Sequence, residues 1–279
     1  MIGFDFEYYR PATSNEAVKL YESLQAQGKR PVYYAGGTEI VTFARLNQIE
    51  TGAVIDINSI RECRVYQFNT SELVIGATVT LTHLAETSAF PLLSVTGGRV
   101  ADHTARNQIT IGGNICGEIN YKEALLPFLL AESNVIIAGN NGYQDKPIME
   151  AFNKRLQLEP GECLVQILTD RKYLNLPYFS VKKRKIDVID YPLLTLTALK
   201  IDNTIRVAFS GLCGYPFRSR EIETILNNHE LSREERIEQT VLHLPAPVLD
   251  DWIGSAEYRL FVLKNTLEDM YLALEGESL

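Results

Sequence analysis

Two pairs of adjacent glycines are the residues whose type and spacing best suit a chemical role. One pair lies in Ala35-Gly36-Gly37-Thr38-Glu39, after a β-type stretch, and the other lies about 75 residues further on, in Thr110-Ile111-Gly112-Gly113-Asn114. Glycine tolerates positive φ and lets backbone N–H groups approach an anion closely, so a strand–Gly-Gly–helix junction can hold a phosphate. Thr38, Thr110 and Asn114 add side-chain donors. The two turns together therefore suggest a phosphate site, whereas a single Gly-Gly pair usually only turns the chain.

The sequence offers no other pattern typical of catalysis or metal binding. Neither turn matches G-x-G-x-x-G or G-x-x-x-x-G-K-[ST], so neither a Rossmann dinucleotide site nor a P-loop is supported. The cysteines form no C-x-x-C pair, which disfavours zinc or an iron–sulfur cluster held by this chain alone. We expect four buried, reduced thiols, at Cys63, Cys116, Cys163 and Cys213. We assign no catalytic acid or base and no metal ligand.

Length and composition exclude several classes of protein. The chain has 279 residues, of which 46% are hydrophobic, and a formal net charge of −8. This length suggests one large or two modest domains, and the acidic balance argues against a nucleic-acid partner. No stretch approaches the roughly 20 apolar residues that span a bilayer, and the N-terminus lacks a secretory pattern. We therefore expect a cytoplasmic protein without a membrane span.

The elements that must position the first turn follow from local patterns. Ser14 is the expected N-cap of an amphipathic helix that Gly28 ends, and residues 31–34 form a strand that leads into the first turn. A helix over 39–46 follows, then strands over 54–57 and 73–79. Thr80 should cap a short helix through residue 86, and a further helix covers 92–103. The first fifty residues thus give helix, strand, glycine turn and helix.

Around the second turn we expect a loop, since residues 110–114 precede a helix over 123–132. Strands follow over 133–138 and 163–168, with a turn at Asn140-Asn141-Gly142. The pattern changes near residues 170–176. Strands are expected over 193–200, which could also be helical, and over 204–209, followed by helices over 220–228, 232–242 and 255–274. Helices gathered after several strands indicate a separate α+β domain.

Five segments, in chain order, carry a resemblance to a known family: Tyr33–Ile40 (YYAGGTEI), Val54–Ile57 (VIDI), Leu73–Thr80 (LVIGATVT), Ala105–Ile115 (ARNQITIGGNI) and Asp250–Arg259 (DDWIGSAEYR). Together they resemble the FAD-binding subunit of the molybdenum hydroxylases, the group that includes xanthine dehydrogenase and carbon monoxide dehydrogenase. The likeness covers essentially the whole chain. The R-N-x-x-T-I-G-G-N-I string is its most specific part.

The resemblance implies an α+β fold in two parts. Residues 1–172 would form an FAD-binding domain of the vanillyl-alcohol-oxidase/PCMH type, with two α+β subdomains that divide near residues 55–60. Residues 173–279 would form a C-terminal α+β domain. FAD would be held through its pyrophosphate by both glycine turns. The implied contacts are Tyr34, Ala35, Gly36, Gly37, Thr38, Glu39 and Ile40 from the first turn, and Asn107, Thr110, Ile111, Gly112, Gly113 and Asn114 from the second.

One stretch departs from the family pattern, and a basic run after it is ambiguous. The family usually continues after Gly-Gly-Asn-Ile with A-S-P-x-x-D, whereas this chain has Cys116-Gly117-Glu118-Ile119-Asn120-Tyr121-Lys122-Glu123. Glu123 takes the aspartate position by spacing. It could accept a hydrogen bond from the cofactor, or serve only as an acid at a helix N-terminus. Lys182 is the candidate for the family's flavin lysine, against a solvated charged turn over 182–185.

The function that the resemblance implies is electron transfer in a complex. A molybdopterin-binding large subunit would oxidise the substrate, and electrons would pass through iron–sulfur clusters of a small subunit to FAD in this chain, then to NAD+ or another acceptor. Such a chain is an oxidoreductase subunit that is active only in complex. Two alternatives stay open: a flavin-free scaffolding or assembly subunit that keeps the fold, and a free-standing flavin oxidase of related fold.

Overall fold

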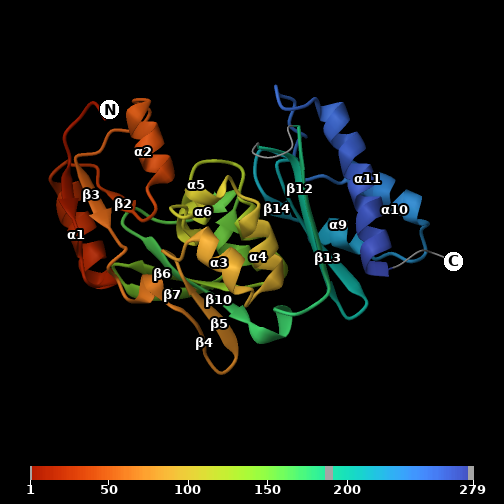
Figure 1. Cartoon of the computed structure of the whole chain (residues 1–279), viewed down its shortest axis with the longest axis horizontal. Coiled ribbons are helices and arrows are strands. Elements are labelled where there is room, and N and C mark those ends of the chain that lie inside the picture. Colours follow the sequence, from red (N-terminus) through yellow and green to blue (C-terminus); the bar gives the residue numbers. More distant parts are fainter. Residues whose placement is uncertain (1, 186–190, 276–279) are drawn as a thin grey trace. The chain divides into compact units, whose positions relative to one another are not determined.

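The chain folds into two compact units, here in a computed structural model that describes residues 2–185 and 191–275. Unit 1 comprises residues 1–87, 103–118 and 132–171, and unit 2 comprises residues 88–102, 119–131 and 172–279. Each unit combines helices with its own sheets (Figure 1). The expected mixed α+β fold is confirmed.

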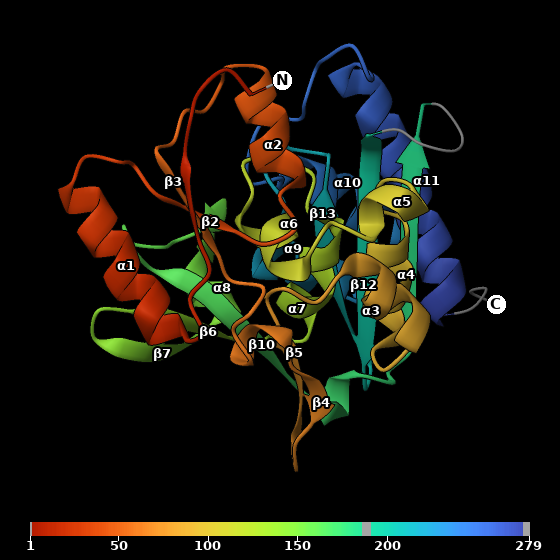
Figure 2. The same cartoon turned by 60° about the vertical axis from the view of Figure 1, so that its left-hand side comes forward.

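The N-terminal part of unit 1 carries the first glycine turn on a small parallel sheet. Its strands, in spatial order β1-β3-β2, are β1 (Glu7–Tyr9), β3 (Ala53–Asp56) and β2 (Val32–Tyr34). Helix α1 (Ser14–Ala26) packs against β3 and lies beside β6 (Asn134–Gly139), as Figure 2 shows, and α2 (Thr38–Arg45) follows the turn. Thr13 caps α1, so the prediction of Ser14 as the N-cap is wrong by one residue. Gly28 ends the helix as expected, with φ of 76°.

The second sheet of unit 1 supports the second glycine turn. It is antiparallel, with spatial order β4-β5-β10-β6-β7. Its remaining strands are β4 (Tyr66–Phe68), β5 (Glu72–Gly76), β7 (Gly142–Pro147) and β10 (Cys163–Asp170), and smaller elements are η1 (Glu62–Arg64), α8 (Ile148–Ala151), β8 (Phe152–Asn153), β9 (Arg155–Leu156) and η3 (Arg171–Tyr173). Gly142 has φ of 90° in the β6–β7 hairpin, which confirms the predicted turn.

Two helical predictions around the second turn need correction. The helix expected over 92–103 is broken: α4 (Pro91–Gly98) ends before a backbone reversal in which Ala101 has φ of 47°, and α5 (His103–Arg106) follows. The loop expected over 110–114 is instead the start of helix α6 (Ile111–Cys116), with Thr110 as its N-cap. The short helix α3 (Leu81–Thr87) begins after Thr80 as predicted.

Unit 2 is an antiparallel sheet covered by helices on both faces. The strands, in spatial order, are β11 (Tyr178–Arg184), β12 (Pro192–Ile201), β13 (Thr204–Ser210) and β14 (Phe217–Arg218). Helices α9 (Arg220–Leu226), α10 (Arg233–Leu242) and α11 (Ala256–Glu275) lie on one face and α4 lies on the other (Figure 1). Helix α7 (Leu126–Leu130) packs against β12, β13 and β14, and η2 (Glu123–Leu125) packs against α4 and α7. β12 pairs with β11 and β13 along its length, so the segment 193–200, which could also have been helical, is a strand. None of the helices within residues 2–185 and 191–275 is long and apolar enough to cross a membrane.

Candidate functional site

The first glycine turn presents unpaired backbone donors at a helix N-terminus. Gly37 is the N-cap of α2 and has φ of 71°; a Cβ there would also overlap the Tyr34 ring. The N–H groups of Gly36, Gly37 and Thr38 have no acceptor among the described residues. Because a helix N-terminus carries partial positive charge, these three groups can bind an anion.

The two glycine turns are packed against each other within unit 1, although they lie far apart in sequence. A Cβ on Gly36 would overlap the backbone carbonyl of Gln108, two residues before Thr110. A Cβ on Gly112 would lie 2.7 Å from the Cβ of Ala77. Both glycines therefore allow close approach of backbone segments rather than a special φ angle.

The backbone donors of the second turn are already used inside the protein. The N–H of Ile111 donates to the carbonyl of Val79 at 2.9 Å, and that of Gly112 donates to the carbonyl of Ala77 at 2.8 Å. The N–H of Gly113 donates to the Thr110 hydroxyl at 3.1 Å. The expectation that both turns wrap one diphosphate with free amides is therefore wrong for Ile111, Gly112 and Gly113. Among the described residues the first turn offers the larger set of unused backbone donors.

The remaining candidates of unit 1 have mainly structural contacts. The Glu39 carboxylate accepts the N–H of Glu118 at 2.7 Å, which ties α2 to the chain that follows α6. Asn107 is exposed, and its side chain lies 3.5 Å from Nδ1 of His103. Ile40 and Asn114 are half-buried.

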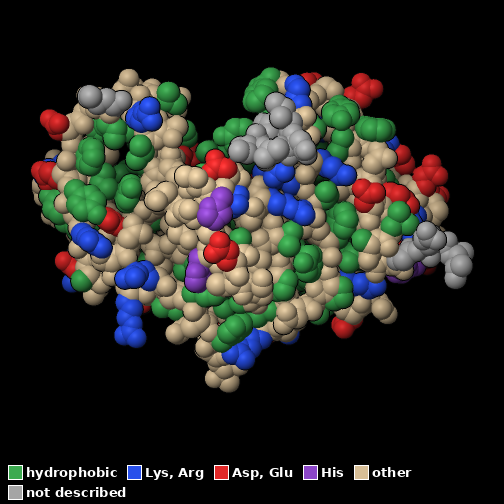
Figure 3. All heavy atoms as spheres, in the orientation of Figure 1, with side chains coloured by type: hydrophobic (Ala, Val, Ile, Leu, Met, Phe, Trp, Pro, Cys, Tyr) green, Lys and Arg blue, Asp and Glu red, His purple; other side chains and the backbone are tan. Residues whose placement is uncertain are grey.

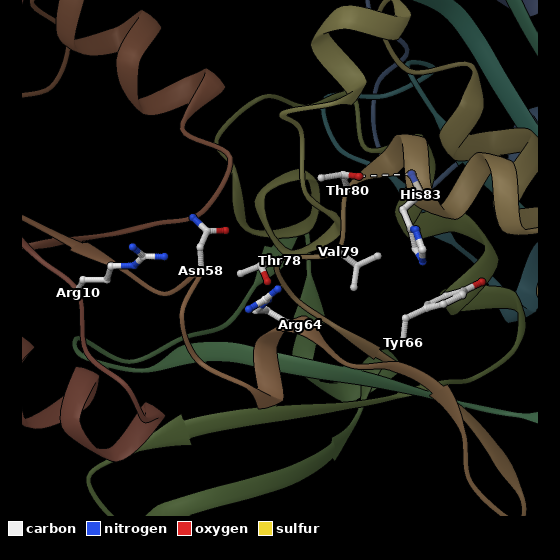
Figure 4. Close-up of a pocket in the computed structure, with 8 residues that line it drawn as sticks. All are labelled: Arg10, Asn58, Arg64, Tyr66, Thr78, Val79, Thr80 and His83. Carbon is white, nitrogen blue, oxygen red and sulfur yellow. Dashed lines mark hydrogen bonds between the residues drawn. The ribbon is translucent and has the colours of Figure 1, made fainter.

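Unit 1 also has a groove of about 500 Å³ (Figure 4). Two of its lining residues are linked to the turns: Asn58 donates to the carbonyl of Ala35, and Thr80 pairs with Thr110. Its lining residues are Arg10, Asn58, Arg64, Tyr66, Thr78, Val79, Thr80 and His83. Arg10 and Asn58 enter from one side, and the edge-on pair of Tyr66 and His83, with ring centroids 4.8 Å apart, forms the other. In the described part of the chain neither arginine pairs with a carboxylate. The groove therefore carries positive charge beside the first turn.

Sequence reasoning missed a polar network beneath the first turn. Asp56, at the end of β3, is buried; its carboxylate accepts hydrogen bonds from Tyr8 and from Asn58, and Asn58 in turn donates to the carbonyl of Ala35. The hydrogen bond to Asp56 raises the pKa of the Tyr8 hydroxyl. The available signal was a carboxylate that interrupts the apolar run Val54–Ile57, because a charge in a buried strand needs partners.

In unit 2 the structure brings the two other candidates together. Glu123 and Lys182 form an ion pair with 2.6 Å between Oε1 and Nζ, and their side chains are 2% and 5% exposed. Lys182 also donates to the backbone carbonyl of Arg99 at 3.1 Å. For Lys182 the predicted alternative of a solvated charged turn is wrong, because this residue lies within strand β11 and its side chain is buried. Of the same run, Lys183 is partly exposed and Lys185 is exposed to solvent.

The basic run continues onto the surface of unit 2. Arg184 donates to the carbonyl of Arg99 at 3.0 Å, and Arg99 donates to the carbonyl of Ser180 at 2.8 Å. Figure 3 shows Lys and Arg side chains gathered on this part of unit 2. Burial, and then the neighbouring charge of Arg184, lowers the pKa of Arg99.

The cysteines differ from the expectation at one position. All four are free, and three are buried, but Cys116 at the end of α6 is exposed. Burial raises the pKa of Cys63 to about 12 and that of Cys213 to about 11. Within the described ranges, no three His, Cys, Asp or Glu side chains cluster in a way that could hold a metal ion.

Comparisons with known proteins place these features in a family. Residues 4–169 match the family described as FAD binding domain in molybdopterin dehydrogenase. The chain is 27% identical to the xanthine dehydrogenase FAD-binding subunit of Escherichia coli O157:H7, over 94% of this chain and 93% of that protein. It is 25% identical to the nicotinate dehydrogenase FAD-subunit of Eubacterium barkeri, over 89% and 86% of the two chains.

Solved structures show the same fold. A chain of carbon monoxide dehydrogenase from Hydrogenophaga pseudoflava, in a form that lacks the Mo-pyranopterin moiety of the molybdenum cofactor, superposes with a TM-score of 0.85 at 24% identity and covers 98% of both chains. A chain of quinoline 2-oxidoreductase from Pseudomonas putida 86 gives a TM-score of 0.81 at 19% identity, with 97% of both chains covered. The match extends through both units.

Proposed function

The chain belongs to the family of FAD-binding domains in molybdopterin dehydrogenases, and from this premise we propose that it is the FAD-carrying electron-transfer subunit of a molybdenum hydroxylase. As a subunit of molybdopterin dehydrogenase oxidoreductase complexes it is an enzyme component. We propose that it takes electrons from iron–sulfur clusters of a partner subunit and passes them to NAD+ or another acceptor.

One observation carries the proposal: the N–H groups of Gly36, Gly37 and Thr38, which have no acceptor in the part of the chain that the structure describes, lie at the positive end of α2. This arrangement fits the diphosphate of FAD, because backbone donors can hold two negative charges without many cationic side chains. The positive groove beside the turn adds to the fit. When bound, FAD supplies a centre that accepts electrons singly and releases them in pairs.

The other proposed contacts use side chains. Besides Tyr34, Ala35, Glu39 and Ile40 of the first turn, the proposed contacts include Asn107, which is exposed, and Asn114, which is half-buried. They also include Thr110, which is buried and whose hydroxyl accepts the N–H of Gly113. In unit 2, Lys182 and Glu123 are proposed to face the flavin part of the cofactor. Their mutual ion pair would hold the lysine ammonium in one place without exposing an unpaired charge.

The proposed setting is a hetero-oligomer. A molybdopterin-binding large subunit and an iron–sulfur small subunit are the proposed partners, with residues 1–172 as the FAD-binding domain and 173–279 as the C-terminal domain. We propose that this complex works in the cytoplasm.

A flavin-free scaffolding subunit is the second candidate, and two observations favour it. The amides of Ile111, Gly112 and Gly113 are bonded within the protein, and Glu123 and Lys182 form an ion pair with each other. Either feature would remain stable in a chain that no longer binds a cofactor.

Purification followed by an absorbance scan tests the choice. The FAD-carrying subunit is expected to show an oxidised flavin band near about 450 nm, or to gain it on reconstitution with FAD and gel filtration. A well-folded chain that stays colourless after reconstitution would support the scaffold instead. Co-purification from the native host then tests the two proposed partner subunits.

A further inference from the structure

Asp56 sits where strand β3 ends, directly beside the strand that leads into the first turn. Its side chain is 6% exposed. Oδ1 accepts two hydrogen bonds from Asn58, one from the backbone N–H at 2.7 Å and one from Nδ2 at 2.8 Å. Oδ2 accepts the hydroxyl of Tyr8. All these partners lie in unit 1.

Asn58 connects the Asp56 carboxylate to the first turn. Its Nδ2 also donates to the carbonyl oxygen of Ala35 at 2.9 Å. In a trans peptide the C=O of one residue and the N–H of the next belong to one rigid plane and point in opposite directions. Fixing the Ala35 carbonyl therefore fixes the direction of the Gly36 N–H, the first of the three free donors.

We propose that Asp56 is a positioning residue for cofactor binding: through Asn58 it holds the Ala35 peptide so that the Gly36, Gly37 and Thr38 amides stay aimed at a diphosphate. The inference rests on the proposed function. Glycines leave this segment with many accessible backbone conformations, so an external hydrogen bond has an ordering role here. Donors held in place before binding avoid the entropic cost of ordering on binding.

A purely structural role makes a different prediction. Tyr8 lies on β1, so its bond to Asp56 joins two strands, whereas the bonds of Asn58 reach the turn. Removal of the Tyr8 hydroxyl should lower stability slightly and leave binding unchanged. Removal of the Asn58 amide should weaken binding.

The experiment compares variants of the full chain with three probes: FAD, ADP, which has the diphosphate without the flavin, and riboflavin, which has the flavin without the diphosphate. We expect Asn58→Ala and Asp56→Ala to weaken the binding of FAD and of ADP by roughly tenfold, as for the loss of one ordered hydrogen bond. The affinity for riboflavin should stay unchanged. Asp56→Asn keeps an acceptor for Asn58 and should restore binding to within about threefold.

Asn69→Ala is the matched control. Like Asp56, Asn69 accepts the backbone N–H two residues further on, here that of Ser71 at 2.9 Å, but it lies in the β4–β5 hairpin. This substitution should leave the binding of all three probes unchanged. Equal loss of riboflavin and ADP in Asn58→Ala, or unchanged ADP binding in a folded Asn58→Ala, would overturn the inference.

NMR relaxation of the backbone amides in the ligand-free chain separates this inference from the proposed function. Asn58→Ala and Asp56→Ala should lower the order parameters of the amides of residues 36–38, and Asp56→Asn should not. If the wild type binds neither FAD nor ADP, the proposed function fails, and unchanged order parameters at residues 36–38 would independently reject the role of Asp56.

Discussion

Gly36 and Gly37 contribute to the same turn for different physical reasons. Gly37 has positive φ, which most side chains disfavour, whereas Gly36 is needed because the backbone at Gln108 leaves no room for a Cβ. Only the close approach at Gly36 brings the two turns into contact. A substitution at Gly36 therefore tests whether contact between the turns matters for binding.

Gly36→Ala should separate the two turns and weaken FAD binding by at least about tenfold, because the new methyl would overlap the Gln108 carbonyl and one of the two must move. The measurement is quenching of FAD fluorescence during titration. Gly214→Ala is the control, since a Cβ at Gly214 meets nothing within 4 Å. Equal affinity of both variants would show that the packing of the turns is irrelevant to the cofactor.

Cys116 should be the only thiol of the described chain that reacts rapidly in the native protein. The thiolate is the reactive form, and burial raises the pKa of Cys63 to about 12 and of Cys213 to about 11, while Cys116 is exposed. Labelling with a chromogenic disulfide at pH 8 is expected to modify one thiol per chain, and four after denaturation. Loss of the fast reaction in Cys116→Ser would assign it; two fast thiols would contradict the burial pattern.

At the scale of elements, local patterns predicted the first turn well. Residues 31–46 show a β-type stretch, two glycines and an amphipathic segment, and the structure has β2, the turn and α2 there. Short helix α6 escaped prediction because two glycines in six residues lower helix propensity, while its Thr110 cap and hydrogen bonds to the chain after β5 stabilise it.

Contacts between distant elements could not be predicted in the same way. The ion pair of Glu123 with Lys182 joins η2 to β11, and no local pattern encodes that pairing. The N–H groups of Ile111 and Gly112 are hydrogen-bonded because the second turn packs on the chain after β5. Resemblance supplied the candidate residues, whereas their hydrogen-bond partners required the folded chain.

The buried pair between η2 and β11 should be far more sensitive to substitution than an exposed pair of equal length. Lys182→Met leaves Glu123 buried without a cation, which we expect to lower the free energy of unfolding by about 3 kcal/mol. The double variant Lys182→Met/Glu123→Gln should recover part of this loss. Lys264→Met breaks the exposed pair with Glu238, also at 2.6 Å, and should cost below about 1 kcal/mol. Urea unfolding measures all three; similar losses for both single variants would contradict the role of burial.

A second ion pair anchors the start of α11 and should depend on pH. Arg259 is fully buried and binds Asp251 at 2.7 Å. Burial raises the pKa of Asp251, but hydrogen bonds from Arg259 and from the amides of Ile253 and Gly254 outweigh it and leave the pKa below its ordinary value. A lowered folded-state pKa stabilises the protein above the unfolded-state pKa, and this stability is lost as pH falls through the folded value.

Asp251→Asn should therefore unfold more easily than the wild type at pH 7, by about 1–2 kcal/mol. The difference should shrink below about pH 4, where the unfolded-state carboxyl takes up its proton. Urea unfolding from about pH 3 to about pH 7, a range that begins below the ordinary pKa of an aspartate, measures this difference. A difference that is constant with pH would mean that Asp251 acts through packing and not through its charge.

At the scale of the whole molecule, the chain carries two cores that serve different candidate groups. The core of unit 1 lies around α1, β3 and β10, and that of unit 2 around β12, β13 and α11. The free amides belong to unit 1 and the buried ion pair to unit 2. The two candidate groups can therefore be tested separately.

Hydrogen exchange with partial cofactors can test this division. ADP should slow exchange at residues 35–41 in unit 1, because the diphosphate occupies the free amides, and should leave residues 122–126 and 181–184 of unit 2 unchanged. FAD should protect both sets, since its flavin adds the contacts proposed for Glu123 and Lys182. If FAD protects only the residues of unit 1, Glu123 and Lys182 do not contact the cofactor, although the first turn still binds the diphosphate. Absence of protection by either ligand would favour the scaffold, because a turn whose donors stay exposed to water in the presence of FAD binds no diphosphate.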